Sequence, residues 1–117
     1  MSFDLEIHQG GTYNLPLIWQ DSSKTPIDIS GRQARMHVRA THSDDAILLE
    51  LTTENGRIVL GGVDGTITLA LTASETAALT LTFGVYDLEL YYDDSGTEVV
   101  DKIIWGNVTV IPEVTRA

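Results

Sequence analysis

The sequence predicts an all-β fold, an antiparallel β-sandwich of about eight or nine short strands. Apolar and polar residues alternate with a period of two along most of the chain, which is typical of strands that bury one face. Turn residues separate these segments at close intervals and no long helical pattern lies between them, which argues against a parallel sheet with crossover helices. A small barrel has a similar pattern, and we favour the sandwich.

The length of 117 residues indicates a single domain, residues 1–117.

The first half of the chain contains most of the expected short strands. They cover residues 3–7, 13–19, 34–40, 47–52 and 57–60. Pro16 lies in the second of these strands, and because proline cannot donate a ladder hydrogen bond, that strand is expected at a sheet edge or at a bulge. Asn55-Gly56 separates the last two, and this dipeptide is a strong signal for a hairpin.

The second half is expected to hold a strand, one helical turn and a long hairpin. The strand covers residues 66–71, and the helical turn lies near residues 73–79 with Thr72 or Ser74 as its cap. Residues 85–92 form the clearest central strand, which a turn at 93–96 joins to a return strand at 99–111. Glycine inside a strand marks a bulge or a bend, so Gly106 predicts one there.

Composition excludes several classes of function. The chain has 17 acidic and 7 basic side chains and a net charge of −10, which repels phosphates and argues against a nucleic-acid partner. The N-terminal residues have neither a basic segment nor an apolar run, so no signal peptide is expected. No segment approaches the roughly 18 apolar residues of a membrane helix, so we expect no membrane insertion. Without cysteine, a disulfide or a cysteine-ligated metal is impossible.

No catalytic, cofactor or metal site emerges from the motifs. His8, His37 and His42 lack the spacing of metal ligands and are expected at the surface, although a site assembled from distant strands stays open. The acidic pairs at 44–45 and 93–94 fall in predicted turns, where Asp is favoured for backbone hydrogen bonding. We therefore expect a protein that is not an enzyme and has no cofactor. A small hydrolase that acts through a convergent acid cluster is a weak alternative.

A basic stripe is the most unusual feature of the sequence. Arg35, His37 and Arg39 share the polar phase of one predicted strand, and residues 24–39 hold four of the seven Lys and Arg side chains. In one interpretation the stripe pairs with Asp87 and Glu89 of a neighbouring strand in the same molecule. In the other it docks on the acidic surface of another copy or another subunit.

Large aromatic residues give a second set of candidates. Trp19, Trp105, Tyr91 and Tyr92 are expected first of all to pack in the core or on the sheet. Tyr91 lies on the outward phase of its strand, where a tyrosine can anchor an interface or stack on a sugar. The candidate interface therefore consists of Arg35, His37 and Arg39, with Tyr91 and Trp19 as weaker members.

Several segments carry a family resemblance. Residues 25–39 (TPIDISGRQARMHVR), 51–62 (LTTENGRIVLGG) and 85–90 (VYDLEL) resemble small proteins encoded among the tail genes of tailed bacteriophages. The segments at 65–69 and 76–79 extend this match over nearly the whole chain. The chain is similar, more weakly, to the N-terminal attachment domain of phage baseplate upper proteins. The resemblance implies an immunoglobulin-like β-sandwich located near the tail, the baseplate or the receptor-binding fibres of a virion.

The resemblance implies that the chain is a non-enzymatic virion protein that acts as an adaptor or decoration subunit. Its expected partners are other phage structural proteins and copies of itself in a symmetric assembly, put together in the cytoplasm of the bacterial host. Two alternatives remain beside it. One is a receptor- or carbohydrate-binding module that uses Tyr91, Tyr92 and the acidic turn after them. The other is a capsid decoration protein.

Overall fold

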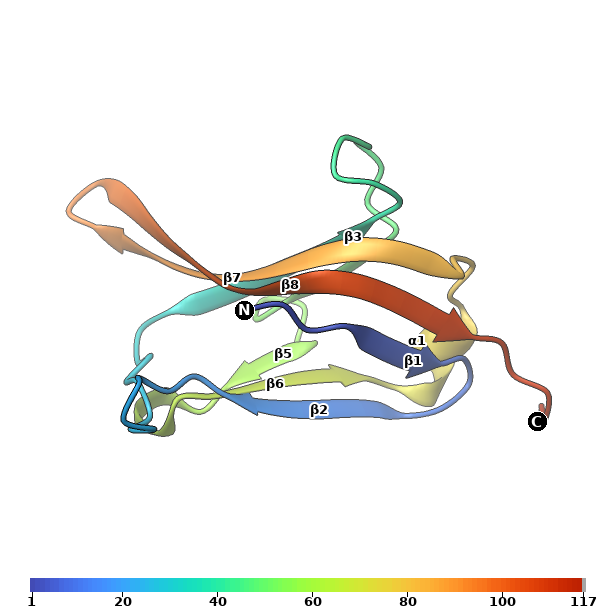
Figure 1. Cartoon of the computed structure of the whole chain (residues 1–117), viewed down its shortest axis with the longest axis horizontal. Coiled ribbons are helices and arrows are strands. Elements are labelled where there is room, and N and C mark those ends of the chain that lie inside the picture. Colours follow the sequence, from blue (N-terminus) through green and yellow to red (C-terminus); the bar gives the residue numbers. More distant parts are fainter. Residues whose placement is uncertain (117) are drawn as a thin grey trace.

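Two β-sheets lie face to face and enclose the hydrophobic core (Figure 1). The computed structural model describes residues 1–116. Sheet A has the strand order β1 (Leu5–His8), β8 (Thr97–Ile111), β7 (Phe83–Asp94), β3 (Gln33–Arg39) and β4 (Leu49–Thr52). Sheet B has the order β2 (Tyr13–Ile18), β6 (Thr66–Leu71) and β5 (Ile58–Leu60). The eight strands confirm the all-β sandwich that the alternating pattern predicts.

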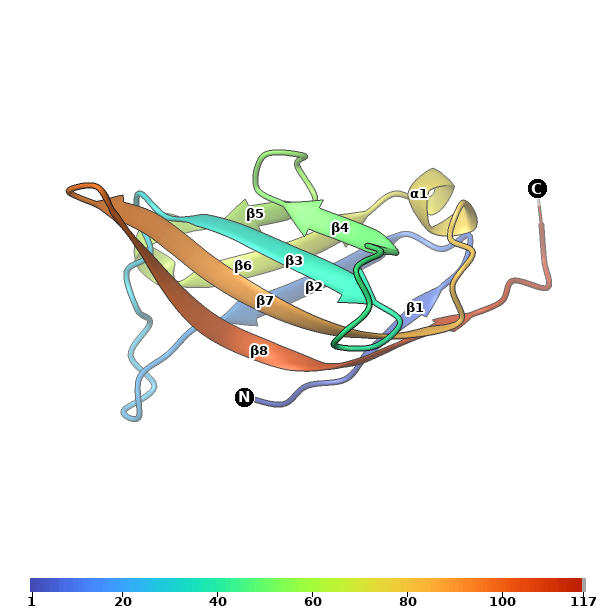
Figure 2. The same ribbon diagram turned by 90° about the horizontal axis from the view of Figure 1, so that it is seen from above.

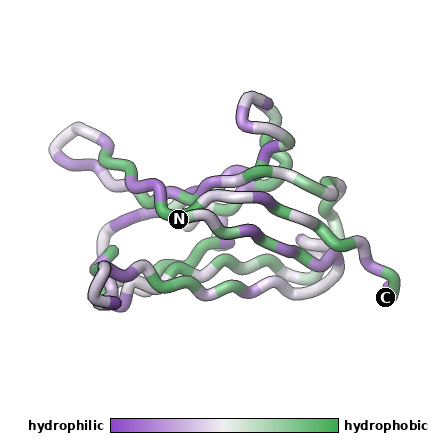
Figure 3. The backbone as a smooth tube through the Cα atoms, in the orientation of Figure 1, coloured by the Kyte–Doolittle hydropathy of each residue, from purple (hydrophilic) through white to green (hydrophobic). Residues whose placement is uncertain are grey.

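The core forms because each strand turns its apolar phase inward. In β3, Ala34, Met36 and Val38 are buried, whereas the charged or polar residues between them face outward. Leu88 of β7 and Leu69 of β6 are fully buried on the two sides of the same core. Each large apolar side chain buried in this way contributes about 1.5–3 kcal/mol. Figure 3 shows the result as alternating hydrophilic and hydrophobic residues along the strands.

Two sequence expectations about turns have opposite outcomes. Ser95 and Gly96 join β7 to β8, and both have positive φ angles (53° and 92°), which fits a tight hairpin turn. The hairpin expected at Asn55-Gly56 is wrong, because β4 belongs to sheet A and β5 to sheet B. The Asn55 side chain accepts hydrogen bonds from the backbone of Thr52 and Arg57. The dipeptide thus shapes a local turn, and this turn carries the chain from one layer to the other.

The pairing of β1 with β8 corrects the expectation of a wholly antiparallel sandwich. These two strands are parallel, with Leu5 opposite Val108, whereas every other strand pair in residues 1–116 is antiparallel. The backbone ahead of β1 also bonds to the edge of β8, with the Phe3 amide donating to the Trp105 carbonyl at 2.8 Å. Since the chain passes from β1 into sheet B, no hairpin turn forces β1 to run against β8.

The bulge expected at Gly106 lies instead at Ile103. Leu88 of β7 is opposite Ile104, whereas the next residue of β7 is opposite Lys102, so Ile103 is the extra residue of β8. A bulge of this kind leaves one residue unpaired and changes which side chains face each side of the sheet. The prediction of a bulge at Gly106 is therefore wrong, and this glycine has a different structural role.

Gly106 makes room for the N-terminal segment of the chain. It lies opposite Tyr86, whose hydroxyl group donates a 2.5 Å hydrogen bond to the carbonyl oxygen of Phe3. A Cβ atom at position 106 would collide with that carbonyl oxygen and would lie 2.8 Å from Oδ1 of Asp4. Burial also raises the pKa of Tyr86. The missing side chain therefore lets residues 3 and 4 cross close to β8.

Short local elements agree with the sequence. The helix α1 covers Ala73–Ala77, with Thr72 as its N-cap, and Thr72 and Glu75 form a reciprocal capping box. Pro16 lies on β2, which is an edge strand of sheet B, and no bulge accompanies it. A single-turn 3-10 helix, η1, covers Gly62–Asp64. Within residues 1–116, no helix has both the length and the apolar character needed to cross a membrane.

Replacing Gly106 tests this close approach. We expect Gly106→Ala to lower the free energy of unfolding by about 1–3 kcal/mol, because the added methyl group must displace backbone rather than a mobile side chain. Amide exchange at Phe3 and Trp105 should speed up as the N-terminal segment leaves the edge of β8. Thr109→Ala, at an exposed position of the same strand, is the control and should change stability by less than about 0.5 kcal/mol. Equal stability of Gly106→Ala and the parent chain would contradict the role given to Gly106.

Candidate functional site

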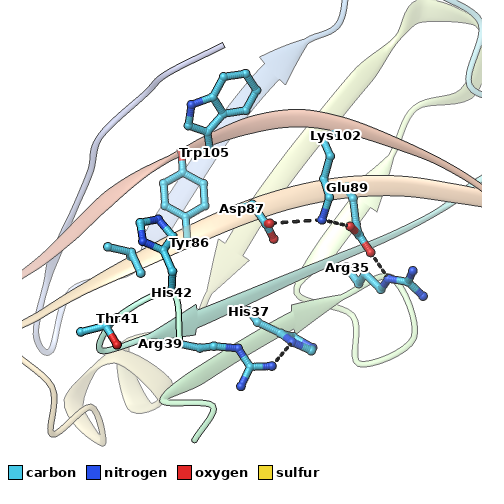
Figure 4. A pocket seen from close by; sticks show the side chains of 11 residues that line it. Arg35, His37, Arg39, Thr41, His42, Tyr86, Asp87, Glu89, Lys102 and Trp105 are labelled. Carbon is cyan, nitrogen blue, oxygen red and sulfur yellow. Dashed lines mark hydrogen bonds and ion pairs between the residues drawn. The ribbon is translucent and has the colours of Figure 1, made fainter. Parts of the chain in front are cut away.

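The outer face of sheet A is hollowed into an open groove of about 640 Å³, which we call the outer groove (Figure 4). Strands β3, β7 and β8 form its floor, and the segment that follows β3 forms one side. It is lined by Arg35, His37, Arg39, Thr41, His42, Val85, Tyr86, Asp87, Glu89, Lys102 and Trp105. It contains most of the charged side chains that the sequence singled out.

β3 places the three residues of the basic stripe on this face. Arg35, His37 and Arg39 alternate with the buried residues of the strand, so all three project outward. Their neighbours across the β3–β7 pair are Glu89, Asp87 and Val85, respectively. The register therefore sets cations of one strand beside carboxylates of the next.

Glu89 is the centre of an ion-pair network in the outer groove. Its carboxylate accepts hydrogen bonds from Nε of Arg35 and from Nζ of Lys102, and only 12% of its side chain is exposed. Arg35 also pairs with Glu98 at 2.9 Å, and Lys102 pairs with Asp87 at 3.1 Å. Burial raises the pKa of Glu89, but the bonds from Lys102 and Arg35 outweigh that effect and hold it below its ordinary value. The bond to Glu89 in turn raises the pKa of Lys102.

The other two residues of the stripe have different partners. Nε2 of His37 lies 3.1 Å from a carboxylate oxygen of Glu50 on β4 rather than from Asp87. Nη1 of Arg39 donates to the backbone carbonyl oxygens of Asp44 and Asp45, at 3.3 and 2.6 Å. Among residues 1–116 no carboxylate forms an ion pair with Arg39. Arg35 is thus neutralised by carboxylates of the same chain. Arg39 has no carboxylate partner in the described residues.

Trp105 belongs to this site, although the candidate interface expected from the sequence does not include it. The residue is 47% exposed and lines the outer groove, opposite Asp87 of β7, and its ring is turned away from the ion pairs around Glu89 (Figure 4). Val108 and Val110 are buried, and counting back from them along the alternation places Trp105 outward. Lys102 lies on the same face of sheet A as Trp105 only because the bulge adds Ile103 to the strand between them.

The two aromatic candidates lie in different places. Tyr91 is on the same outer face as the stripe, with the Arg35 guanidinium carbon 4.1 Å from its ring centroid, and its hydroxyl donates to Gln33 at 2.8 Å. Trp19 follows β2 on the inward phase, is half-buried and packs against the core. Arg32 lies over its ring at 5.9 Å. The structure therefore brings Tyr91 to the stripe and leaves Trp19 away from it.

The acidic pairs have structural partners in the turns. Asp44 accepts a hydrogen bond from the backbone of Ala46, and Asp93 accepts one from the backbone of Gly96. Both bonds are of the type that makes aspartate common in turns. In the part of the chain that the structure describes, no three His, Asp or Glu side chains gather into a group that could hold a metal ion.

Comparison with known proteins gives a match at the level of structure. No family model matches the sequence, and no curated protein matches it. The fold is similar to that of the N-terminal domain of phage TP901-1 ORF48, with a TM-score of 0.53 and 11% sequence identity. The similarity covers 92% of this chain and 83% of that one. At this identity, the comparison shows a shared fold.

The network around Glu89 should make stability depend on pH. We expect Glu89→Gln to lower the free energy of unfolding at neutral pH by about 1 kcal/mol, because two charge-assisted bonds to partly exposed cations are weakened. The folded-state pKa of Glu89 lies below its unfolded value, so the carboxylate stabilises the fold above the unfolded pKa of about 4.3. This contribution disappears as the pH falls through the folded-state value.

Urea unfolding of the parent and Glu89→Gln chains at several pH values measures this dependence. The difference between them should shrink as the pH falls from about 7 to about 3. Glu54→Gln is the control, since Glu54 is exposed and forms no ion pair within residues 1–116. A penalty for Glu89→Gln that stays constant over this pH range would show that its ionised form does not stabilise the fold.

Proposed function

We propose that the chain is a non-enzymatic structural protein of a bacteriophage virion, an adaptor that joins neighbouring subunits of the tail or baseplate. The observation that carries this proposal is that Trp105 and Arg39 both line the outer groove. The first is a large aromatic residue left half exposed, and the second is a cation without a carboxylate partner among residues 1–116. Tryptophan and arginine are the residue types most enriched at the energetic centres of protein interfaces.

The sequence and the fold support the phage context of this proposal. Three segments of the chain resemble proteins encoded among phage tail genes, and the resemblance extends weakly to the attachment domain of baseplate upper proteins. The similar fold of the N-terminal domain of phage TP901-1 ORF48 places the same architecture in a phage protein. One line of support comes from residue patterns and the other from backbone geometry.

The outer face of sheet B offers a second contact surface. Its outward residues are Asn14, Pro16, Ile18, Val59, Thr66, Thr68 and Ala70, none of which is charged. Ile18 and Val59 are 55% and 56% exposed, respectively. The two sheets are the two layers of the sandwich, so this face points away from the outer groove (Figure 1). Two surfaces on opposite sides suit a subunit that joins two neighbours.

The test is mass spectrometry of purified virions of the phage that encodes the chain. We expect the protein in mature particles in a fixed ratio to other tail proteins. Trp105→Ala should reduce incorporation by roughly tenfold or more, since an interface anchor of this type contributes about 2 kcal/mol. Val63→Ala, which truncates an exposed side chain remote from the outer groove, should incorporate like the parent.

Absence of the parent protein from mature particles would exclude a virion role. Normal incorporation of Trp105→Ala would exclude the outer groove as the contact surface. Binding of the chain to host cells or glycans, with incorporation independent of Trp105, would favour the receptor-binding alternative. Circular dichroism of each purified variant establishes that the substitution leaves the fold intact.

A further inference from the structure

The end of the β7–β8 hairpin forms an arm that projects from the sandwich. β3 accompanies β7 only as far as the pair of Gln33 with Tyr91, and beyond it β7 and β8 pair with each other alone. Figures 1 and 2 show this hairpin end reaching out past the other strands. Residues 93–98 are all exposed. We call residues 92–99 the acidic arm.

The acidic arm carries uncompensated negative charge at its tip. It contains Asp93, Asp94 and Glu98 and no Lys, Arg or His. Glu98 pairs with Arg35 of the same chain at 2.9 Å. Neither Asp93 nor Asp94 forms an ion pair with any other residue of the described range 1–116. The turn between the strands is small, since Ser95 and Gly96 are its two residues.

The outer groove contains one cation without a carboxylate partner among residues 1–116. Of its three Arg and Lys side chains, Arg35 and Lys102 are paired with carboxylates of the same chain. Arg39 is the cation that lacks a carboxylate, and Trp105 provides an exposed aromatic surface on the same face (Figure 4). The outer groove thus combines one unpaired cation with an exposed aromatic side chain on a strongly acidic molecule.

The shape of sheet A leaves this face accessible. In Figure 1 the acidic arm and the loop between β3 and β4 both rise from the layer of sheet A. The outer face lies between these two projections. The base of the arm stays on its own sheet, where Glu98 pairs with Arg35, whereas the tip of the arm extends past the other strands (Figure 2) and is exposed to a second molecule.

We propose that the acidic arm of one copy binds in the outer groove of a second copy. Asp93 and Asp94 supply the carboxylates that Arg39 lacks, and Trp105 packs against the turn at residues 95–96. The inference rests on the proposed function and names the partner of the outer groove. Because the arm and the outer groove are different surfaces, the contact is heterologous, and its repetition produces a ring or an open chain of subunits.

A pair of charge reversals tests the proposal directly. Asp94→Lys should weaken self-association because it sets a lysine against Arg39, and Arg39→Glu should weaken it because it sets a glutamate against Asp93 and Asp94. An equimolar mixture of the two variants should associate again, since the introduced lysine of one variant then meets the introduced glutamate of the other, and the unchanged arm meets the unchanged outer groove. Sedimentation velocity at low salt measures all three samples, and we expect each variant alone to associate at least tenfold more weakly than the mixture.

Two controls carry the same change of charge outside the proposed contact. Glu54→Lys matches Asp94→Lys, and Lys24→Glu matches Arg39→Glu, and both control positions are exposed. Each control should associate like the parent chain. A parent chain that stays monomeric up to about 1 mM, or a mixture that associates no better than its components, would overturn the proposal.

Directed cross-linking provides a second readout, because the chain has no cysteine. Thr97→Cys marks the arm and Thr41→Cys marks the rim of the outer groove. Under mild oxidation a chain with both substitutions should form a ladder of trimers and larger species, whereas each single variant stops at dimers. Lack of a ladder would contradict a heterologous contact.

Failure of this inference can be separated from failure of the proposed function. A protein present in virions that neither associates through Arg39 and Asp94 nor forms the ladder keeps its structural role and loses the arm contact. A protein that passes both association tests but is absent from virions keeps the arm contact and loses the virion role.

Discussion

The pairing of β7 with β8 is the interaction on which the rest of this structure depends. These are the longest strands, and their remaining edges take up the other strands of sheet A, with β3 beside β7 and β1 beside β8. Their inward residues, among them Leu88 and Ile104, cover sheet B across the core. Their outward residues form much of the outer groove, and the end of the same hairpin forms the acidic arm. The core, the outer groove and the acidic arm therefore share one pair of strands.

The single bulge in this pair determines which chemistry reaches the surface. Residues three positions apart in a regular strand point to opposite faces of the sheet. Lys102 and Trp105 point to the same face because Ile103 is an extra residue between them. Without this bulge, either Trp105 would point into the core or Lys102 would point away from the carboxylate of Glu89. The outer groove thus owes its combination of a cation network and an exposed aromatic side chain to a local change of register.

The charge balance of the molecule explains why the outer groove stands out. An acidic protein has few cations, and most of those in this chain bind carboxylates of the same molecule. Glu89 forms ion pairs with two of these cations, Arg35 and Lys102, on the outer face of sheet A. Arg39 contacts backbone carbonyl oxygens and the ring of His37, which leaves its charge without an ionic partner in the described residues. A carboxylate of a partner that pairs with Arg39 would contribute to the orientation and the rate of association more than to the affinity.

The sequence by itself determined the features that depend on neighbours in the chain. The period of two fixed which face of β3 and β7 is buried, Pro16 limited its strand to a sheet edge or a bulge, and Thr72 was one of two residues suited to cap α1. The tertiary structure decided what depends on residues far apart. It sent the turn at Asn55 between the sheets, made β1 parallel to β8, and moved the bulge to Ile103. It also exposed Trp105 while it packed Trp19 against the core, because alternation gives the phase of a strand and only the partner strands give its register.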